Sequence, residues 1–332
     1  MSSRPIVVLC GGVGAARFLR ALTMVVAPTE VTAIVNTGDD TTMHGLRICP
    51  DLDTVTYTLA QAIDHERGWG LINETWHAME SLRRYESQRP DGSNAGGTWF
   101  GLGDRDLATH LYRTARIDEG ATLTEVTREI AKSWNVEVEL LPMTESPAPT
   151  TVLVDPAIDA GPAGDGRIAF QDYFVRHHHS IPVRSVDLAA RHATPTQEVQ
   201  RALSQAQVIV VAPSNPFVSI GPIRALQGID DLLSAAHDRT VAISPIIGGE
   251  ALKGPAADMM RSFGVRADAL GIAEHYQRIA RHIVIDDIDR HLSDHIAALG
   301  LSVSVTNTLM ADPNVAARLA SATLNAAGYQ LD

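Results

Sequence analysis

The fold is decided by residues 5–17, which read Pro-Ile-Val-Val-Leu-Cys-Gly-Gly-Val-Gly-Ala-Ala-Arg. Residues 5–10 form an apolar run typical of a buried parallel strand, and the glycines after it lead into a helical pattern over residues 15–24. A second apolar segment at residues 31–35 completes a βαβ unit. This opening predicts a Rossmann-like, doubly wound, mostly parallel α/β sheet, whose ligands bind at the carboxyl ends of the strands.

The apolar pattern of parallel strands returns in the second half of the chain. We predict strands at residues 208–211, 241–243, 282–285 and 301–305, with helical stretches between them. The whole chain, residues 1–332, is therefore expected to form a single Rossmann-like domain.

Two additions are predicted between the halves of this domain. Amphipathic spacing of apolar residues predicts a mostly helical insertion over residues 55–135. Short extended segments bounded by Pro and Gly predict a small β extension over residues 136–181. Within the insertion, residues 90–97 are rich in Gly, Ser, Asn and Asp, a composition that predicts a mobile loop.

The composition excludes several classes of protein. Hydrophobic residues make up 45% and charged residues 20% of the chain, which is typical of a folded globular protein. The net charge of −12 argues against a nucleic-acid partner, because such binding requires clustered Lys and Arg. Two cysteines fit a reducing compartment, and no apolar run is long enough for a signal-peptide core or a membrane span. We expect a cytoplasmic protein without a membrane partner.

The glycine turn Gly11-Gly12-Val13-Gly14 offers backbone N–H groups to a phosphate. It resembles a dinucleotide fingerprint, although Arg17 stands at the third glycine position. Asp39 lies at about the distance where such enzymes carry a ribose-binding acid, so a nicotinamide enzyme stays an alternative. In a third interpretation, the glycines only allow tight packing of a strand against a helix.

Aspartates gather after the second predicted strand, in Asn36-Thr37-Gly38-Asp39-Asp40 and in Cys49-Pro50-Asp51-Leu52-Asp53-Thr54. Carboxylates repel a phosphate unless a hard divalent cation lies between them, and Mg²⁺ takes oxygen ligands. The pairing with the glycine turn therefore predicts a magnesium-bound phosphate. Helix capping and Asx-turns are the alternative for each aspartate, above all for Asp53, which precedes an apolar helix.

Two later strand ends carry further candidate ligand-binding loops. Ser214 and Asn215 follow the strand at 208–211 and supply a hydroxyl and an amide for a phosphate or a base edge. Gly248 follows the next strand and permits close approach of the backbone to a ligand. A turn bounded by prolines, in which Ser and Asn cap the helix, is the alternative for the first loop.

Taken together, the motifs resemble the 2-phospho-L-lactate transferase family, whose members build the deazaflavin cofactor F420. The resemblance covers nearly the whole chain. It is carried by the glycine turn through Phe18 and by the motifs at residues 35–40, 49–54, 67–70, 102–110, 170–172, 212–216, 244–248 and 309–310.

The resemblance implies a reaction between two small molecules. The terminal ribityl hydroxyl of Fo (7,8-didemethyl-8-hydroxy-5-deazariboflavin) attacks a guanylylated phospho-acid donor, and GMP leaves. In different relatives the transferred group is phospholactyl, phosphoenolpyruvyl or phosphoglyceryl. The resemblance also implies Mg²⁺ as cofactor and a homodimer.

The site residues follow from the same resemblance. Asp40, Asp51 and Asp53 are expected to hold Mg²⁺, and one of them is expected to accept the hydroxyl proton. The residues expected to bind the substrates are Gly11, Gly12, Gly14, Thr37, Asp39, Ser214, Asn215 and Gly248.

One alternative of another class is a non-catalytic regulator that binds a nucleotide sugar, resembling gluconeogenesis factors. Such a protein need not carry the motifs at 51–53 and 102–110, and both are present here. The motifs do not identify the transferred acid, because acids that differ by a single small group can be distinguished by one pocket side chain.

Overall fold

The opening segment forms the predicted βαβ unit. The structure is a computed structural model that describes residues 5–90, 93, 95 and 97–331. Strands β1 (Ile6–Cys10) and β2 (Val31–Val35) pair in parallel, and α1 (Gly12–Leu22) lies between them in the chain. The helix begins at the glycine turn itself, three residues before the predicted start at residue 15.

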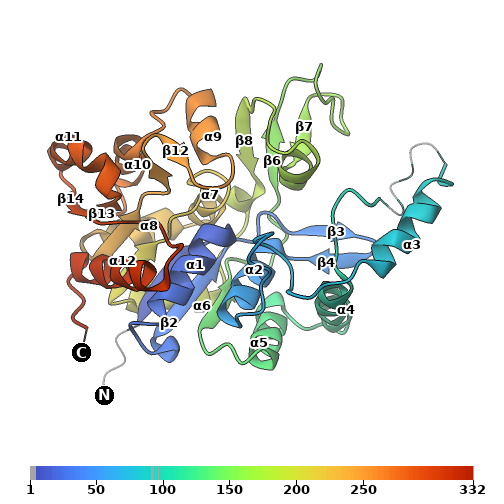
Figure 1. Cartoon of the computed structure of the whole chain (residues 1–332), viewed down its shortest axis with the longest axis horizontal. Helices are drawn as coiled ribbons and strands as arrows, with labels where there is room; N and C mark the ends of the chain where they lie inside the picture. Colours follow the sequence, from blue (N-terminus) through green and yellow to red (C-terminus); the bar gives the residue numbers. More distant parts are fainter. Residues whose placement is uncertain (1–4, 91–92, 94, 96, 332) are drawn as a thin grey trace.

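The central sheet has seven strands in the order β14-β13-β10-β9-β1-β2-β5, and every pair of neighbours is parallel (Figure 1). The strands of the second half are β9 (Val208–Val211), β10 (Thr240–Ile243), β13 (His282–Ile285) and β14 (Ser302–Val305). Chain order reverses between β1 and β9, which makes this the switch point of a doubly wound sheet. The predicted Rossmann-like α/β fold is confirmed.

Helices cover both faces of the sheet, and successive residues of β1 point to opposite faces. Val7 and Leu9 pack in one apolar core, and Ile6 and Val8 pack in the other. The first core includes α6 (Gln197–Gln205), α7 (Ile220–Ala225), α8 (Ile229–Ala235), α9 (Ala256–Ser262), α10 (Ala269–Tyr276) and α11 (Ser293–Ala298). The second includes α1, α2 (Pro50–Leu59), α5 (Leu123–Ser133) and α12 (Pro313–Ala326).

Most of the region from residue 41 to residue 133 projects from one end of the sheet, and α3 lies farthest out (Figure 1). It contains the hairpin of β3 (Thr41–Met43) and β4 (Leu46–Ile48), then α2, α3 (His77–Glu86), α4 (Asp104–Asp118) and α5. The mobile loop predicted at 90–97 includes residues 91, 92, 94 and 96, which lie outside the described residues.

The predicted limits of the β extension, 136–181, differ from the observed strand pairing. β5 (Glu139–Pro142) joins the central sheet beside β2, because Leu140 and Leu141 are buried in opposite cores as in any strand covered on both faces. The separate small sheet consists of β7 (Arg167–Ala169), β6 (Thr150–Leu153) and β8 (Ser185–Leu188), so it extends past residue 181.

Short elements complete the chain. Residues Asp172–Arg176, which lie within the predicted β extension, form a single π-helical turn instead of a strand. β11 (Ile246–Ile247) and β12 (Glu250–Ala251) form a small hairpin after β10. The 3₁₀ turns are Pro28–Glu30, Ala189–His192, His237–Arg239 and Asp287–Leu292. Among the described residues, no helix combines the length and the apolar character that crossing a bilayer requires.

Candidate active site

A cavity of about 440 Å³ lies where the strand order reverses, at the carboxyl ends of β1, β2, β9 and β10. The central domain supplies the glycine turn and the loops after β9 and β10, while the other walls come from residues of the region 41–133 and of the small sheet. Ligands of doubly wound folds bind at such a switch point.

The two loops at the switch point are packed so tightly that glycine is required. A Cβ atom at Gly14 would overlap the carbonyl oxygen of Pro213 in the loop after β9. A Cβ atom at Gly11 would lie 2.7 Å from Oδ2 of Asp51. The hydroxyl of Ser214 donates to the carbonyl oxygen of Gly11 at 2.8 Å, which joins the two loops. The glycine turn thus lets the backbone approach both a neighbouring loop and a carboxylate.

We call Asp39, Asp40 and Asp51 the acidic cluster. Asp51 lies in the first turn of α2, and the amide of Asn36, at the end of β2, donates to its Oδ2 at 2.9 Å. The thiol of Cys49 lies near Asp40 and opposes the rise in the pKa of its carboxyl. Burial raises the pKa of Asp40 to about 8 and that of Asp51 to about 6; burial and the nearby Asp51 carboxylate also raise the pKa of Asp39.

The charge of the acidic cluster is not neutralised by an ion pair within the described residues, although the charge of Arg113 opposes the rise in the pKa of Asp40. Within the part of the chain that the structure describes, no Lys or Arg forms an ion pair with Asp39, Asp40 or Asp51. The buried Oδ1 atoms of Asp39 and Asp40 and the hydroxyl of Thr37 have no hydrogen-bond partner among these residues. Hard oxygen donors without a counter-charge are the ligand set that suits Mg²⁺.

Asp53, by contrast, is paired with a buried arginine. The guanidinium of Arg113, on α4, binds both carboxylate oxygens, with Nη1 3.2 Å from Oδ2 and Nη2 in contact with Oδ1. The Arg113 side chain is 2% exposed and that of Asp53 8%. Burial opposes the charge on Arg113, but the Asp53 carboxylate outweighs this effect and raises the pKa of the guanidinium.

Arg113 also positions a pair formed by His110 and Asp106. Nη1 of Arg113 lies 3.2 Å from Nδ1 of His110, and because a guanidinium has only donors, Nδ1 must be the acceptor. Nε2 of His110 faces Oδ2 of Asp106 at 3.4 Å, and the hydroxyl of Tyr57 donates to Oδ1 of Asp106 at 2.6 Å. We call Asp53, Tyr57, Asp106, His110 and Arg113 the Arg113 network.

The Arg113 network includes a possible metal-binding group. Ligand atoms of Asp53, Asp106 and His110 lie within 4.8 Å of one another, a spacing that would suit a cation. Arg113 already supplies a positive charge to this group, and it occupies both oxygens of Asp53. This positive charge disfavours a cation there, but among the described residues no other group of three such side chains, the acidic cluster included, brings its ligand atoms within that spacing.

Aromatic side chains line two other parts of the cavity. Trp69 and Phe100 come from the helical insertion, and Phe170 and Phe174 come from the region of the small sheet. The rings of Phe170 and Phe174 are stacked, with centroids 5.6 Å apart and an angle of 25° between the planes. Flat apolar faces of this kind can hold a planar ring.

The cavity brings together most of the residues predicted from the sequence. Its lining includes Gly11, Gly12, Gly14, Asp39, Asp51, Asp53, Ser214 and Asn215. Three predicted residues, Thr37, Asp40 and Gly248, are not part of the lining. The N–H of Gly248 donates to Asp289 instead, and Oδ1 of Asn215 accepts from the backbone of Phe217 and Val218.

Sequence reasoning did not assign several residues of the site. Tyr57, Arg67, Asp106, His110 and Lys253 line the cavity, and Arg113 supports it from behind. The motif at 102–110 gave a signal for Asp106 and His110, because its charged residues begin a helix. Nothing in the sequence pairs Arg113 with Asp53, because these residues are 60 positions apart.

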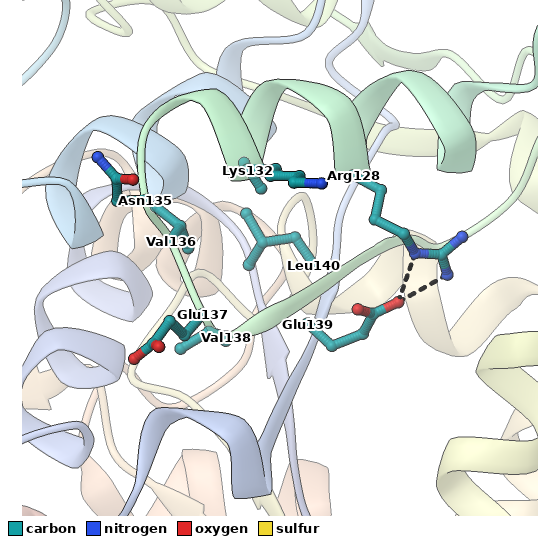
Figure 2. A pocket seen from close by; sticks show the side chains of 9 residues that line it. Arg128, Lys132, Asn135, Val136, Glu137, Val138, Glu139 and Leu140 are labelled. Carbon is teal, nitrogen blue, oxygen red and sulfur yellow. Dashed lines mark hydrogen bonds and ion pairs between the residues drawn. The ribbon is translucent and has the colours of Figure 1, made fainter.

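Two other hollows lie away from these residues. One, of about 480 Å³, lies between the end of α5 and the amino end of β5 (Figure 2). The site lies at the carboxyl ends of the strands, which is the opposite edge of the sheet. Arg128 is paired with Glu139 across this pocket at 2.6 Å, and the pocket contains none of the predicted site residues (Figure 2). The other lies beside β8 and is lined by Arg224, Asp230 and His275 among others.

Comparison with known proteins identifies the family of the chain. The model of the family described as 2-phospho-L-lactate transferase CofD matches residues 6–313. The phosphoenolpyruvate transferase of Nocardia farcinica is 40% identical over 327 residues, covering 98% of this chain and 95% of that protein. The phosphoenolpyruvate transferase of Mycolicibacterium smegmatis is 40% identical over 337 residues, covering 98% and 99%.

A solved structure shows the same fold at lower identity. The crystal structure of a UPF0052 family protein from Bacillus halodurans matches with a TM-score of 0.62 and 19% identity, covering 98% of this chain and 99% of that one. The family match spans almost all of the chain, and it includes every residue of the cavity lining. The chain belongs to the 2-phospho-L-lactate transferase CofD family and is thus a transferase of coenzyme F420 biosynthesis.

Proposed function

We propose that the protein transfers a phospho-acid from a guanylylated diphosphate donor to the ribityl hydroxyl of Fo. The hydroxyl oxygen attacks the phosphorus that bears the acid, a new P–O bond forms, and the bond to the GMP phosphate oxygen breaks. The hydroxyl proton passes to a carboxylate, and GMP leaves with the bonding electron pair. The relatives named phosphoenolpyruvate transferase favour the phosphoenolpyruvyl group as the one transferred.

The observation that carries this proposal is the position of Asp51 against the glycine turn. Its Oδ2 would lie 2.7 Å from a Cβ at Gly11, and the backbone N–H of Gly12 opposes the rise in the pKa of its carboxyl. A phosphate held by the turn would therefore lie beside a buried carboxylate, which is unfavourable without a cation between them. The residues thus suit a metal-bound diphosphate better than a free one.

The proposed metal is Mg²⁺, and the acidic cluster supplies its protein ligands. Asp40 and Asp51 keep the role predicted from the sequence, and Asp39 joins them because its buried Oδ1 has no other partner among the described residues. Asp53 was predicted as a ligand too, and for it we now propose an indirect role, since both of its oxygens contact Arg113. When bound, Mg²⁺ would offset the charge of the diphosphate and of the leaving GMP.

The remaining catalytic work is positioning. Phosphoryl transfer needs alignment and charge stabilisation and does not require a covalent intermediate on the protein. The glycine turn offers backbone N–H groups to phosphate oxygens at the start of α1. A buried carboxylate of the acidic cluster accepts the proton, and the aromatic walls hold the planar rings of the two substrates out of water.

A product assay tests the proposal. The protein is incubated with Fo, Mg²⁺ and, in separate reactions, each of the three guanylylated donors, and GMP and the Fo adduct are measured by mass spectrometry. We expect the fastest GMP release with the phosphoenolpyruvyl donor. No GMP release with any donor would refute the function. Titration of Fo fluorescence separates a transferase, which binds Fo, from a nucleotide-sugar-binding regulator, which does not.

A further inference from the structure

Two loops that are far apart in the sequence face each other at the cavity. The loop Leu252–Gly254 follows β12, and the loop Arg67–Gly70 belongs to the helical insertion; both line the cavity. Gly68 has a positive φ of 79°, and a Cβ atom there would lie only 2.9 Å from Nζ of Lys253. The ammonium of Lys253 thus lies beside Gly68, on the opposite wall of the cavity entrance.

The other cations around the cavity are mostly engaged. Arg67 pairs with Asp64 at 3.0 Å, donates to the carbonyl oxygen of Leu71 at 2.9 Å, and lies 5.5 Å from the ring centroid of Trp69. Arg113 is bound to Asp53. Lys253 is exposed, and within the described part of the chain it forms no ion pair. Arg17 on α1, which also lines the cavity, is partly buried and likewise forms no ion pair there.

We propose that Lys253 is an anion-binding residue that holds a phosphate or carboxylate oxygen of the guanylylated donor. The inference rests on the proposed function, since only that function supplies such a donor. A lysine ammonium is a compact point charge on a flexible side chain. It can therefore adjust to an anion that binds from solution more easily than the rigid, planar guanidinium of an arginine. When it engages the donor, Lys253 also links the β11–β12 hairpin to the insertion loop at Gly68.

Lysine chemistry gives a direct test, because the chain contains only two lysines, Lys132 and Lys253. Lys132 lies on α5 in the pocket of Figure 2 and serves as an internal control. The protein is acetylated with an N-hydroxysuccinimide ester, and both lysines are followed by peptide mass spectrometry. The probes are GDP with Mg²⁺, which offers phosphate oxygens only, and phosphoenolpyruvate, which adds a carboxylate.

We expect a bound probe at about ten times its Kd to slow acetylation of Lys253 about tenfold by mass action, and to leave Lys132 unchanged. Protection by GDP assigns the contact to phosphate oxygens, and protection by phosphoenolpyruvate alone assigns it to the acid end of the donor. Acetylation of Lys253 at the same rate with and without both probes overturns the inference.

Matched variants give the kinetic readout. Lys253→Gln should raise the KM for the donor about tenfold, the effect of losing one charge-assisted hydrogen bond, while kcat and the KM for Fo stay nearly constant. Lys253→Arg should recover most of the donor affinity, and Lys132→Gln should behave as the unchanged protein.

The two proposals fail in different ways. If the unchanged protein releases no GMP from any donor, the transferase function fails, while the acetylation experiment still reports whether Lys253 binds an anion. If GMP is released and Lys253→Gln has the same donor KM as Lys132→Gln, the role of Lys253 is refuted and the transferase function stands.

Discussion

The ion pair between Arg113 and Asp53 should be one of the costliest side-chain contacts to remove in this protein. Arg113→Met keeps much of the side-chain volume and removes the charge, which leaves the Asp53 carboxylate buried with 8% of its side chain exposed. Two further contacts of Nη1, to the carbonyl oxygen of Arg47 at 3.3 Å and to Nδ1 of His110 at 3.2 Å, are lost as well. Breaking a buried pair from one side costs about 3–5 kcal/mol.

Thermal unfolding measures this cost. For 332 residues, an unfolding entropy of about 2.1 cal/mol/K per residue converts 3–5 kcal/mol into a fall in Tm of about 4–7 °C. The matched control is Arg116→Met on the same helix, because Arg116 also pairs with a carboxylate, Glu129 at 2.9 Å, but its side chain is 31% exposed. A surface pair contributes about 1 kcal/mol or less, so this control should shift Tm by about 1 °C.

The double variant Arg113→Met/Asp53→Asn completes the test. It removes both charges, so its Tm should fall by less than the sum of the two single falls, and this coupling identifies the pair as the source of the cost. Equal Tm values for Arg113→Met and Arg116→Met, or additive single effects, would show that Arg113 does not neutralise a buried charge. The reasoning about Asp53 would then be wrong.

Three further predictions concern the acidic cluster and the glycine turn. Asp51→Asn should bind Mg²⁺ more weakly by calorimetry and lose GMP release while its circular dichroism stays native; retained turnover would exclude Asp51 from the metal site. In EDTA, the raised pKa values keep Asp40 protonated in the folded protein up to about pH 8 and Asp51 up to about pH 6, whereas an Asp in the unfolded chain loses its proton near pH 3.8. The folded protein therefore loses stability progressively as the pH rises from about 4 to 8. Asp40→Asn/Asp51→Asn should therefore gain Tm relative to the unchanged protein as pH rises over this range, and a constant difference would contradict the shifts. Gly14→Ala should cost about 1–3 kcal/mol in urea unfolding, because the new methyl overlaps the carbonyl oxygen of Pro213, and unchanged stability would show that the loop after β9 moves freely.

The strands of the fold could be predicted closely because each is a short apolar run bounded by polar residues. The predicted segments 31–35, 208–211 and 282–285 coincide with β2, β9 and β13. The same pattern misassigned β5, since its apolar residues do not show which strand they will pair with. Sheet order is set by tertiary packing, here by burial of Leu140 and Leu141 in opposite cores.

Site residues that lie directly after a strand could be predicted from the sequence, and those on other elements could be predicted less well. Gly11, Gly14 and Asp39 follow β1 and β2, so the parallel topology alone brings them to one edge. Asp51 and Asp53 were recognised by their motif, but a hairpin separates them from β2, and they lie inside the first turn of α2. The partner of Asp53 comes from α4, a contact that no local spacing encodes.

The division of the cavity walls has a consequence for how this scaffold can diversify. The glycine turn and the acidic cluster come from loops of the central sheet and the start of α2, whereas the aromatic faces come from the insertion and the small sheet. The glycine turn and the acidic cluster are thus encoded by other stretches of sequence than the aromatic faces. Substitutions that reshape the aromatic faces therefore need not alter any residue of the glycine turn or of the acidic cluster, so the ring-binding walls can change in evolution while those residues stay the same.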